Sequence, residues 1–328
     1  MPNKILDAQI ELQLDLARTS SSIEKDVLVL LVAMQKELVA KIAAGDFTAI
    51  SRARIDQQLR QVSGLISEYY DKAATIVSEA SPAIAEVTAL ATKQSLAVGA
   101  TVAAMPSKAM LEAIASQSVV QGAAQGAWWA KQSADTAFKY GQAVRQGLVA
   151  GETNQQIIAR VRSFMDVSRR SAAALVQTSV ATVANDSRFA VYAANDDIIK
   201  RYRAVATLDS HTCLTCAPLD GLEWQKDGAA IGHKFSLPRY PLHMNCRCLT
   251  IPVIFDGPQG GQRASADGPI AASTSFDDWL KRQSPEKIEE VLGKGRADLY
   301  QSGKLTLTDL VSGRGKPLSL KALQHKYA

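Results

Sequence analysis

All four cysteines of this 328-residue chain lie in one short segment that runs from Cys213 to Cys248. Three of the four histidines, His211, His233 and His243, lie in or beside the same segment. A random distribution would rarely place every thiol in so small a part of a chain. We therefore expect the segment to hold a metal site or a covalent crosslink, which constrains how the surrounding residues fold.

The spacing of these residues is typical of a metal site. Cys213 and Cys216 are separated by two residues, 29 residues follow, and Cys246 and Cys248 are separated by one. A Cys-x2-Cys turn brings two thiolates to one ion, and a second group of ligands on another loop completes a tetrahedron. His243, three residues before Cys246, adds a fifth candidate ligand for four positions. The residue types favour zinc, which binds thiolate and imidazole in tetrahedral sites.

Three ligand sets remain open from the sequence. On a strand, Cys246 and Cys248 face the same side and can both reach the ion; otherwise His243 replaces one of them. Four protein ligands leave no open position for water, so we expect a structural zinc that clips a small module. Two alternatives need no metal: a pair of disulfides, which a reducing cytosol disfavours, and four buried thiols.

Zinc-dependent catalysis fits the sequence less well. A nucleoside-type deaminase needs His-x-Glu followed by Pro-Cys-x-x-Cys, and a zinc protease needs His-Glu-x-x-His; neither motif occurs. The remaining enzyme alternative is a ββα-type metal-dependent nuclease, with His233, His243 and Asn245 imitating a His-Asn-His constellation. That chemistry needs a histidine base and a metal at the scissile phosphate, whereas His243 is already a candidate zinc ligand. We therefore expect a protein that is not an enzyme.

Two charged residues flank the candidate ligands. Asp209 precedes the first cysteine pair and is expected to accept backbone N–H groups in a turn, or to support the ligands. Arg247 lies between Cys246 and Cys248. The sequence leaves open whether Arg247 makes a structural contact or binds phosphate.

The rest of the chain is predicted to be mainly helical. Apolar residues recur at threes and fours over 3–44 and over about 48–79, and Ser81-Pro82 suits the start of a third helix. Gly45-Asp46 provides a stop after the first helix. Residues 95–150 are rich in alanine and mostly helical, with breaks near Met105-Pro106 and Gly122. Because only 6% of the residues are aromatic, we expect these helices to pack through small side chains.

The second half combines helices with short strands. Helices are predicted over 153–164 and 168–195, strands over 202–207, 221–224 and 248–255, and short helices over 276–283, 285–292 and 305–311. Residues 257–275 have the composition of a flexible linker. The expected organisation is a helical region (1–150), a zinc-clipped α+β module (151–256), the linker (257–275) and a small helical tail (276–328).

Composition narrows the range of functions. The longest apolar run, Val27 to Met34, has eight residues, whereas a membrane-spanning helix needs about 20. The first residues lack the layout of a signal peptide, so we expect a protein made and kept in the cytosol. The net charge of +5 is modest for this length, and a dedicated duplex-DNA binder usually has denser lysine and arginine clusters.

Several motifs between Thr178 and Val253 resemble one known family. They are a helix with Thr178, Asn185, Arg188 and Tyr192; a strand from Tyr202 to Thr207; Asp209, Thr212, Cys213 and Cys216; Leu219-Asp220-Gly221; and Pro241, His243, Cys246, Arg247 and Cys248. This pattern resembles the Mu F-like family of tailed-phage minor head proteins, also called phage head morphogenesis proteins. One departure is Tyr240, because many relatives have two prolines before the histidine. Stretches 278–283 and 302–305 also resemble the C-terminal extension of such proteins, so the similarity covers residues 150–325.

The resemblance implies a non-enzymatic minor capsid protein that occurs in few copies in the virion. Members of the family associate with the portal, enter the procapsid, and help in head assembly and in DNA packaging or ejection. The implied partners are the portal protein and the major capsid and scaffold proteins, with packaged DNA as a further candidate. The protein would be made in the host bacterial cytoplasm, and its N-terminal helices would dock through an apolar stripe. A DNA-binding internal virion protein is an alternative within this class.

Overall fold

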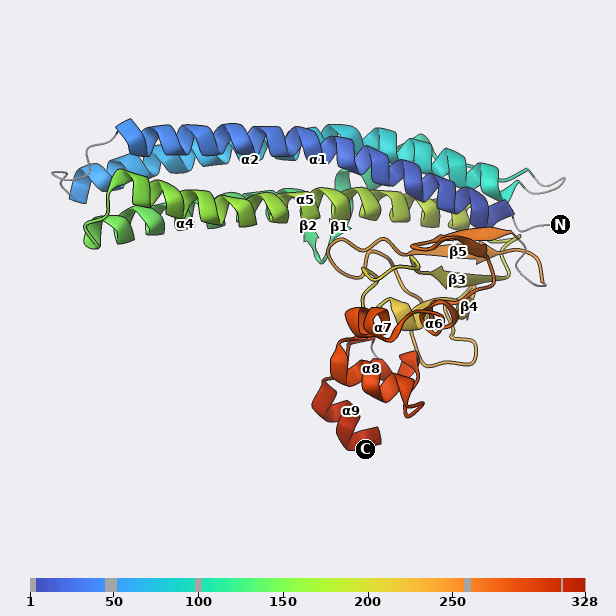
Figure 1. Cartoon of the computed structure of the whole chain (residues 1–328). Helices are drawn as coiled ribbons and strands as arrows, with labels where there is room; N and C mark the ends of the chain where they lie inside the picture. The colour runs from blue at the N-terminus through green and yellow to red at the C-terminus, as the bar shows by residue number, and fades with distance from the viewer. Residues whose placement is uncertain (1–3, 45–51, 98–101, 257–260, 314, 328) are drawn as a thin grey trace. The chain divides into compact units, whose positions relative to one another are not determined.

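The computed structural model describes residues 4–44, 52–97, 102–256, 261–313 and 315–327 (Figure 1). Long helices come first: α1 (Lys4–Ala44), α2 (Arg52–Leu96), α3 (Lys108–Gln117), α4 (Gln125–Val149) and α5 (Asn154–Ala193). Short strands and short C-terminal helices follow, so the expected mainly α architecture is confirmed. The predicted helix stop at Gly45-Asp46 and the predicted start near residue 48 lie outside the described residues.

The chain divides into two compact units. The helical unit comprises residues 16–84 and 112–183, and the sheet unit comprises residues 1–15, 85–111 and 184–328. The boundaries fall within α1, α2, α3 and α5, because each of these helices contributes residues to both units. The sequence suggests domain boundaries at residues 150 and 256. Whether the segments between these boundaries fold independently stays a prediction.

Apolar residues line one face of each long helix of the helical unit, as their spacing predicts. Val27 and Leu31 of α1 are fully buried. Tyr70 of α2 lies against Trp129 of α4, with ring centroids 6.3 Å apart, and its hydroxyl is 2.8 Å from the hydroxyl of Thr136. The core of this unit is therefore formed by side chains from helices that are distant in sequence.

Two helices are longer than the sequence predicts. α2 continues through Pro82 to Leu96 instead of ending at Ser81-Pro82. α5 is one helix, and the predicted break between residues 164 and 168 is wrong. Ile84 and Met165 are buried beside these two places, so the apolar face continues across each of them. Packing of that face outweighs a proline, which costs about 3 kcal/mol in a helix interior.

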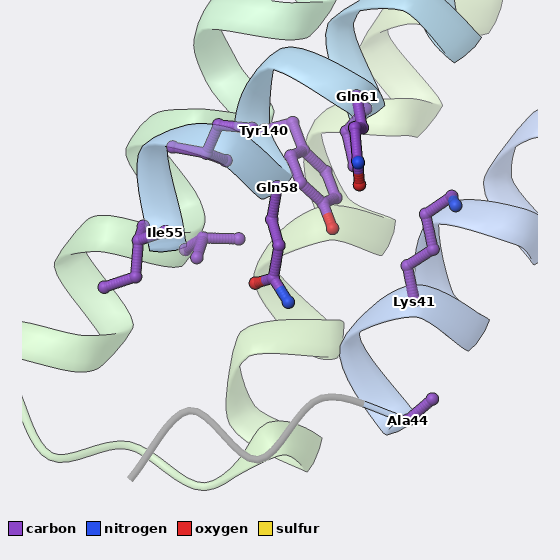
Figure 2. Close-up of a pocket in the computed structure, with 9 residues that line it drawn as sticks. Lys41, Ala44, Ile55, Gln58, Gln61 and Tyr140 are labelled. Atoms are coloured by element: carbon purple, nitrogen blue, oxygen red, sulfur yellow. The ribbon is translucent and has the colours of Figure 1, made fainter. Parts of the chain in front are cut away.

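A small hairpin and a cavity complete the helical unit. Strands β1 (Val119–Val120) and β2 (Ala123–Ala124) pair around Gln121 and Gly122, whose φ angles are +47° and +84°. Two positive φ angles are typical of a two-residue turn, for which glycine is suited. A cavity of about 230 Å³ lies between α1, α2 and α4. Tyr140 and Gln58 point into it (Figure 2). Its lining is otherwise mainly aliphatic and brings together no catalytic constellation.

The sheet unit is built around a three-stranded antiparallel sheet in the order β4-β3-β5. The strands are β3 (Arg201–Val205), β4 (Glu223–Gln225) and β5 (Leu249–Val253), close to the predicted positions. Leu249 and Ile251 of β5 pack with Leu6 of α1 and with Val205. Trp224 of β4 lies in a second apolar cluster, which also contains the buried cysteines.

Residues 261–275 are ordered structure, and the linker that the sequence predicts there is wrong for these residues. They contain a hairpin of β6 (Gln262–Ser265) and β7 (Gly268–Ala271). Arg263 of β6 points inward and is 6% exposed. The sequence of this hairpin consists mainly of small and polar residues and has no apolar stripe. The hairpin is instead held by one buried charged residue, so the sequence pattern does not predict it. Residues 257–260 lie outside the described part of the chain.

The C-terminal residues pack on the sheet module. The tail contains α6 (Phe276–Leu280), α7 (Pro285–Leu292), α8 (Lys294–Gln301), the 3-10 helix η2 (Leu307–Leu310) and α9 (Leu320–Tyr327). α8 and α9 were not predicted, and a 3-10 turn replaces the helix expected over 305–311. Leu208 and Ala217 share a core with the tail residues Phe276, Trp279 and Leu280. The described residues of the tail are therefore packed against the sheet module and do not form a separate module.

Candidate metal centre

Antiparallel pairing of β3 with β5 brings the two cysteine pairs together. β3 ends at Val205, whose pairing partner is Leu249, the first residue of β5. The chain that leaves β3 and the chain that enters β5 are therefore neighbours. The first of these carries Cys213 and Cys216, and the second carries His243, Cys246 and Cys248.

Short contacts link four of the five candidate ligands. The Nε2 atom of His243 is 3.0 Å from the Sγ of Cys213 and 3.4 Å from the Sγ of Cys216. The Sγ atoms of Cys216 and Cys246 are 3.7 Å apart. Around zinc, with Zn–S near 2.3 Å and Zn–N near 2.0 Å, tetrahedral angles separate two sulfurs by about 3.8 Å and a sulfur from a nitrogen by about 3.5 Å. The residues present therefore fit the ion that the spacing suggests.

Cys248 belongs to the same cluster but is placed differently. The ligand atoms form two groups of three, Cys213 with Cys216 and His243, and Cys216 with Cys246 and Cys248, each within 4.8 Å. Cys216 is common to both groups and is fully buried. All four cysteines are free thiols. The structure thus brings every predicted ligand together, and this group could hold a metal ion.

The ligand loops hold His243 in the orientation that a metal needs. Its Nδ1 atom is 2.8 Å from the carbonyl oxygen of Met244, to which it can donate its proton. This contact leaves Nε2 facing the thiols as the coordinating atom, an arrangement found in many metal-binding histidines. Asn245, with a φ of +61°, makes the tight turn that returns the chain to Cys246.

Hydrogen bonds within the cluster separate the pKa values of its members. The hydrogen bond from Cys216 lowers the pKa of Cys213 to about 4, and His243 adds to this effect. The hydrogen bond with Cys213, followed by the one with Cys246, raises the pKa of His243 to about 11. The hydrogen bond from Cys216 also lowers the pKa of Cys246. These shifts favour the thiolate form of Cys213 and Cys246, which is the form that binds metal ions.

An ion pair between Asp209 and Arg247 joins the two ligand loops. The Nη1 and Nη2 atoms of Arg247 donate to the two carboxylate oxygens of Asp209, at 2.6 and 2.7 Å. The same carboxylate accepts the backbone N–H of His211 at 3.0 Å, as a turn residue should. Asp209 is therefore the turn residue that the sequence suggests, and Arg247 makes a structural contact. A bidentate pair of this kind restricts the relative position of its two partners.

His233 lies outside this cluster and has no free ring nitrogen. Its Nε2 atom is 2.7 Å from the carbonyl oxygen of Glu223, and its Nδ1 atom accepts the backbone N–H of Phe235 at 3.3 Å. The ring also packs edge-on against Trp224, with centroids 4.7 Å apart. A general base needs an accessible nitrogen, so this geometry does not suit His233 for the catalytic part that a nuclease requires.

Comparison with known protein families identifies the segment that contains the cluster. Residues 138–251 match a family model described as Phage Mu protein F like protein. This match places residues 138–251, about a third of the chain, in the Mu F-like family. The matched residues include α5, β3, β4 and every candidate ligand. No curated protein and no solved structure matches the chain.

The Mu F-like match of this segment suggests a protein of phage head morphogenesis. The family is one of structural phage head proteins, which suggests the virion as the location. Among the described residues, no helix combines the length and the apolarity that a bilayer crossing requires.

Motif residues of the Mu F-like pattern hold the sheet unit together. Arg188 is buried and donates to the side-chain oxygens of Gln9 at 3.0 Å and Gln13 at 2.9 Å, both on α1. The hydroxyl of Tyr192 donates to the carbonyl of Thr250 on β5 at 3.1 Å. These positions therefore fasten α1 and β5 to α5. At the departure from the family pattern, Tyr240 is buried and its peptide bond to Pro241 is cis.

The sequence did not reveal the role of Asp220. Its carboxylate accepts hydrogen bonds from the backbone N–H groups of Ala206 and Phe276, each at 2.7 Å. It also accepts hydrogen bonds from the Nη1 and Nη2 atoms of Arg263, each at 3.0 Å. Asp220 belongs to the motif Leu219-Asp220-Gly221, but Arg263 lies in the segment that the sequence predicts to be a linker. Three segments meet at this carboxylate: the end of β3, the β6–β7 hairpin and the start of α6. No short-range pattern signals such a contact, because Asp220 and Arg263 are 43 residues apart.

We expect the substitution Asp209→Asn to weaken metal binding by about 10- to 100-fold, the usual effect of removing support from a ligand shell. Asparagine keeps the shape of the side chain but loses the bidentate ion pair with Arg247. Competition with a chromophoric zinc chelator measures the affinity. Asp227→Asn is a matched control, because Asp227 accepts a backbone N–H two residues ahead, at 2.8 Å from Ala229, in the same module. Equal affinities for Asp209→Asn and the unaltered protein would contradict the positioning role.

Proposed function

We propose that the protein is a minor head protein that occurs in few copies at the portal vertex of a phage. In this proposal it acts in head assembly and in DNA packaging or ejection. The match of residues 138–251 to the Mu F-like family carries the proposal. The proposed partners are the portal protein and the major capsid and scaffold proteins, and packaged DNA is a further candidate.

We also propose that Cys213, Cys216, His243 and Cys246 bind one structural zinc ion. Contacts of 3.0, 3.4 and 3.7 Å between their ligand atoms support this choice among the five candidates. Bound zinc would crosslink the loop after β3 to the loop before β5. Cys248 is then a buried thiol beside the site. The small apolar cluster around Trp224 would gain stability from such a crosslink.

Exposed apolar residues on α1 offer a surface for docking on a head protein. In the helical unit, Val29 is 61% exposed and Val32 is 41% exposed. They line a shallow hollow that Lys25 and Lys36 also border. Partner helices commonly bind through apolar residues at such helical spacing. This surface supports the proposal that the long helices, and not the metal module, contact the head.

A double substitution on this surface tests the proposed role. Val29→Asp combined with Val32→Asp is expected to reduce incorporation into heads by about tenfold or more, since it places two charges in the contact. The zinc content should not change. Quantitative mass spectrometry of purified heads, relative to the major capsid protein, measures both the copy number and the loss. Ser22→Asp, an exposed position on the same helix, is the control. Absence of the protein from purified heads would refute the proposed function.

The nuclease alternative has a direct test. In a metal-dependent plasmid-nicking assay, the purified protein and its His233→Ala variant should give the same result. Both ring nitrogens of His233 are held by backbone groups, so His233 should not take part in cleavage. Cleavage that depends on His233 would replace the structural role by an enzymatic one.

A further inference from the structure

A basic groove lies in the sheet unit, next to the metal module and apart from the ligands themselves. It has a volume of about 560 Å³ and lies between one wall of residues 235–239 and Leu242 and another of Gly313, Gly315, Lys316 and Pro317. Its floor includes Leu219, Leu237 and Leu242, and its rim includes Arg239 and Lys316. Volumes of this size are typical of binding sites for small ligands or short peptide segments.

The charge of the groove has one sign. Arg239 and Lys316 are exposed lining residues, and the lining contains no acidic residue. Lys234 stands beside them, with its side chain next to Gly313. Within the part of the chain that the structure describes, none of these three cations forms an ion pair. Arg239 is held in place by the ring of Phe189, whose centroid is 3.6 Å from the guanidinium carbon. The groove therefore has fixed positive charge that no neighbouring carboxylate neutralises.

The wall formed by residues 235–239 also has unused backbone groups. Ser236 and Leu237 make no backbone hydrogen bond to any residue that the structure describes. The neighbouring residues are anchored: the carbonyl of Phe235 accepts from Trp224 at 2.7 Å, and that of Pro238 accepts from Thr250 at 3.1 Å. A fixed segment with free N–H and C=O groups can pair with the backbone of an added peptide.

Single-stranded nucleic acid fits this groove less well than a peptide does. Binding of single strands without sequence preference relies on exposed aromatic rings on which bases stack. The one aromatic lining residue, Phe235, is only 4% exposed, so the groove offers no stacking face. Its partly buried leucines instead suit aliphatic side chains.

From the charge, the aliphatic floor and the free backbone we infer that this groove binds a peptide segment of a partner protein in which acidic residues alternate with aliphatic ones. Acidic side chains would lie at Arg239 and Lys316, and aliphatic side chains would lie against Leu237 and Leu242. The inference rests on the groove alone and does not depend on the identity of the metal or on the α1 surface.

Fluorescence anisotropy with the full chain tests this inference. The probe is a fluorescein-labelled peptide of alternating glutamate and leucine. Comparison probes are a lysine–leucine peptide, a glutamate–serine peptide and a labelled oligothymidylate. We expect the glutamate–leucine peptide to bind at least about tenfold more tightly than each comparison probe.

Variants of the rim connect this binding to the groove. Arg239→Glu combined with Lys316→Glu should weaken binding of the glutamate–leucine peptide by about tenfold or more, whereas Lys304→Glu, at an exposed position elsewhere in the tail, should not. The zinc content and circular dichroism of each variant show that it is folded. The inference is overturned if the glutamate–leucine peptide does not bind, if the double variant binds it equally well, or if oligothymidylate binds more tightly.

Discussion

Replacing Cys216 by serine is expected to abolish metal binding and to unfold the module around the cluster. Cys216 is the one thiol shared by both groups of candidate ligands, and it is fully buried. It contacts the Nε2 of His243 and the Sγ of Cys246 at tetrahedral distances. Binding of a structural zinc contributes about 10–16 kcal/mol in small zinc modules, which is as large as the total stability of a typical domain.

Elemental analysis measures the first part of this prediction. Protein purified without chelator should contain about one zinc per chain, and Cys216→Ser should contain almost none. Trp224 is fully buried in the module, so a change in tryptophan fluorescence should report unfolding of the module. The helical unit has its own buried core, so the helical circular dichroism signal should largely remain. A zinc content near zero in the unaltered protein would rule out the metal site.

Cys248→Ser is the matched control, because Cys248 is also buried but lies outside the proposed ligand set. It should retain zinc, whereas His243→Gln should lose it. If Cys248→Ser loses the metal and His243→Gln keeps it, the ion is bound by four thiolates instead. This comparison decides between the proposed ligand set and the set of four cysteines.

Replacing Arg263 by methionine is expected to destabilise the sheet unit by about 3–5 kcal/mol, the usual cost of removing one partner from a buried ion pair. The side chain of Asp220 is 1% exposed and that of Arg263 is 6% exposed. Methionine fills similar space but leaves the Asp220 carboxylate without its counter-charge. The carboxylate would keep two backbone N–H groups, from Ala206 and Phe276, which are too few to compensate for burial of the charge.

Urea denaturation followed by tryptophan fluorescence measures this loss. Arg282→Met replaces an exposed arginine in the same part of the chain and should change stability by less than about 0.5 kcal/mol. Adding Asp220→Asn to Arg263→Met removes the uncompensated charge and should recover part of the loss. If Arg263→Met is as stable as Arg282→Met, the buried pair does not hold the hairpin and tail in place.

The residues by themselves determined the chemistry of the candidate site and the class of the fold. Two thiols in a Cys-x2-Cys spacing lie close together whatever the rest of the fold. The candidate ligands could therefore be named without coordinates. The helical periodicity of α1 and the alternation in β3 are also local, because they depend on the repeat of a helix or strand. The motifs from Thr178 onward further pointed to the family that residues 138–251 match.

Only the tertiary structure decided which distant groups meet. Continuity of α2 through Pro82 depends on apolar contacts made by residues such as Ile84, and these contacts outweigh the local preference of proline. The hairpin around Arg263 depends on Asp220, and the convergence of Cys216 with Cys246 depends on the antiparallel pairing of β3 with β5. Each of these features joins residues far apart in sequence. Short-range propensity carries no record of such contacts, because their free energy arises only when the segments are packed together.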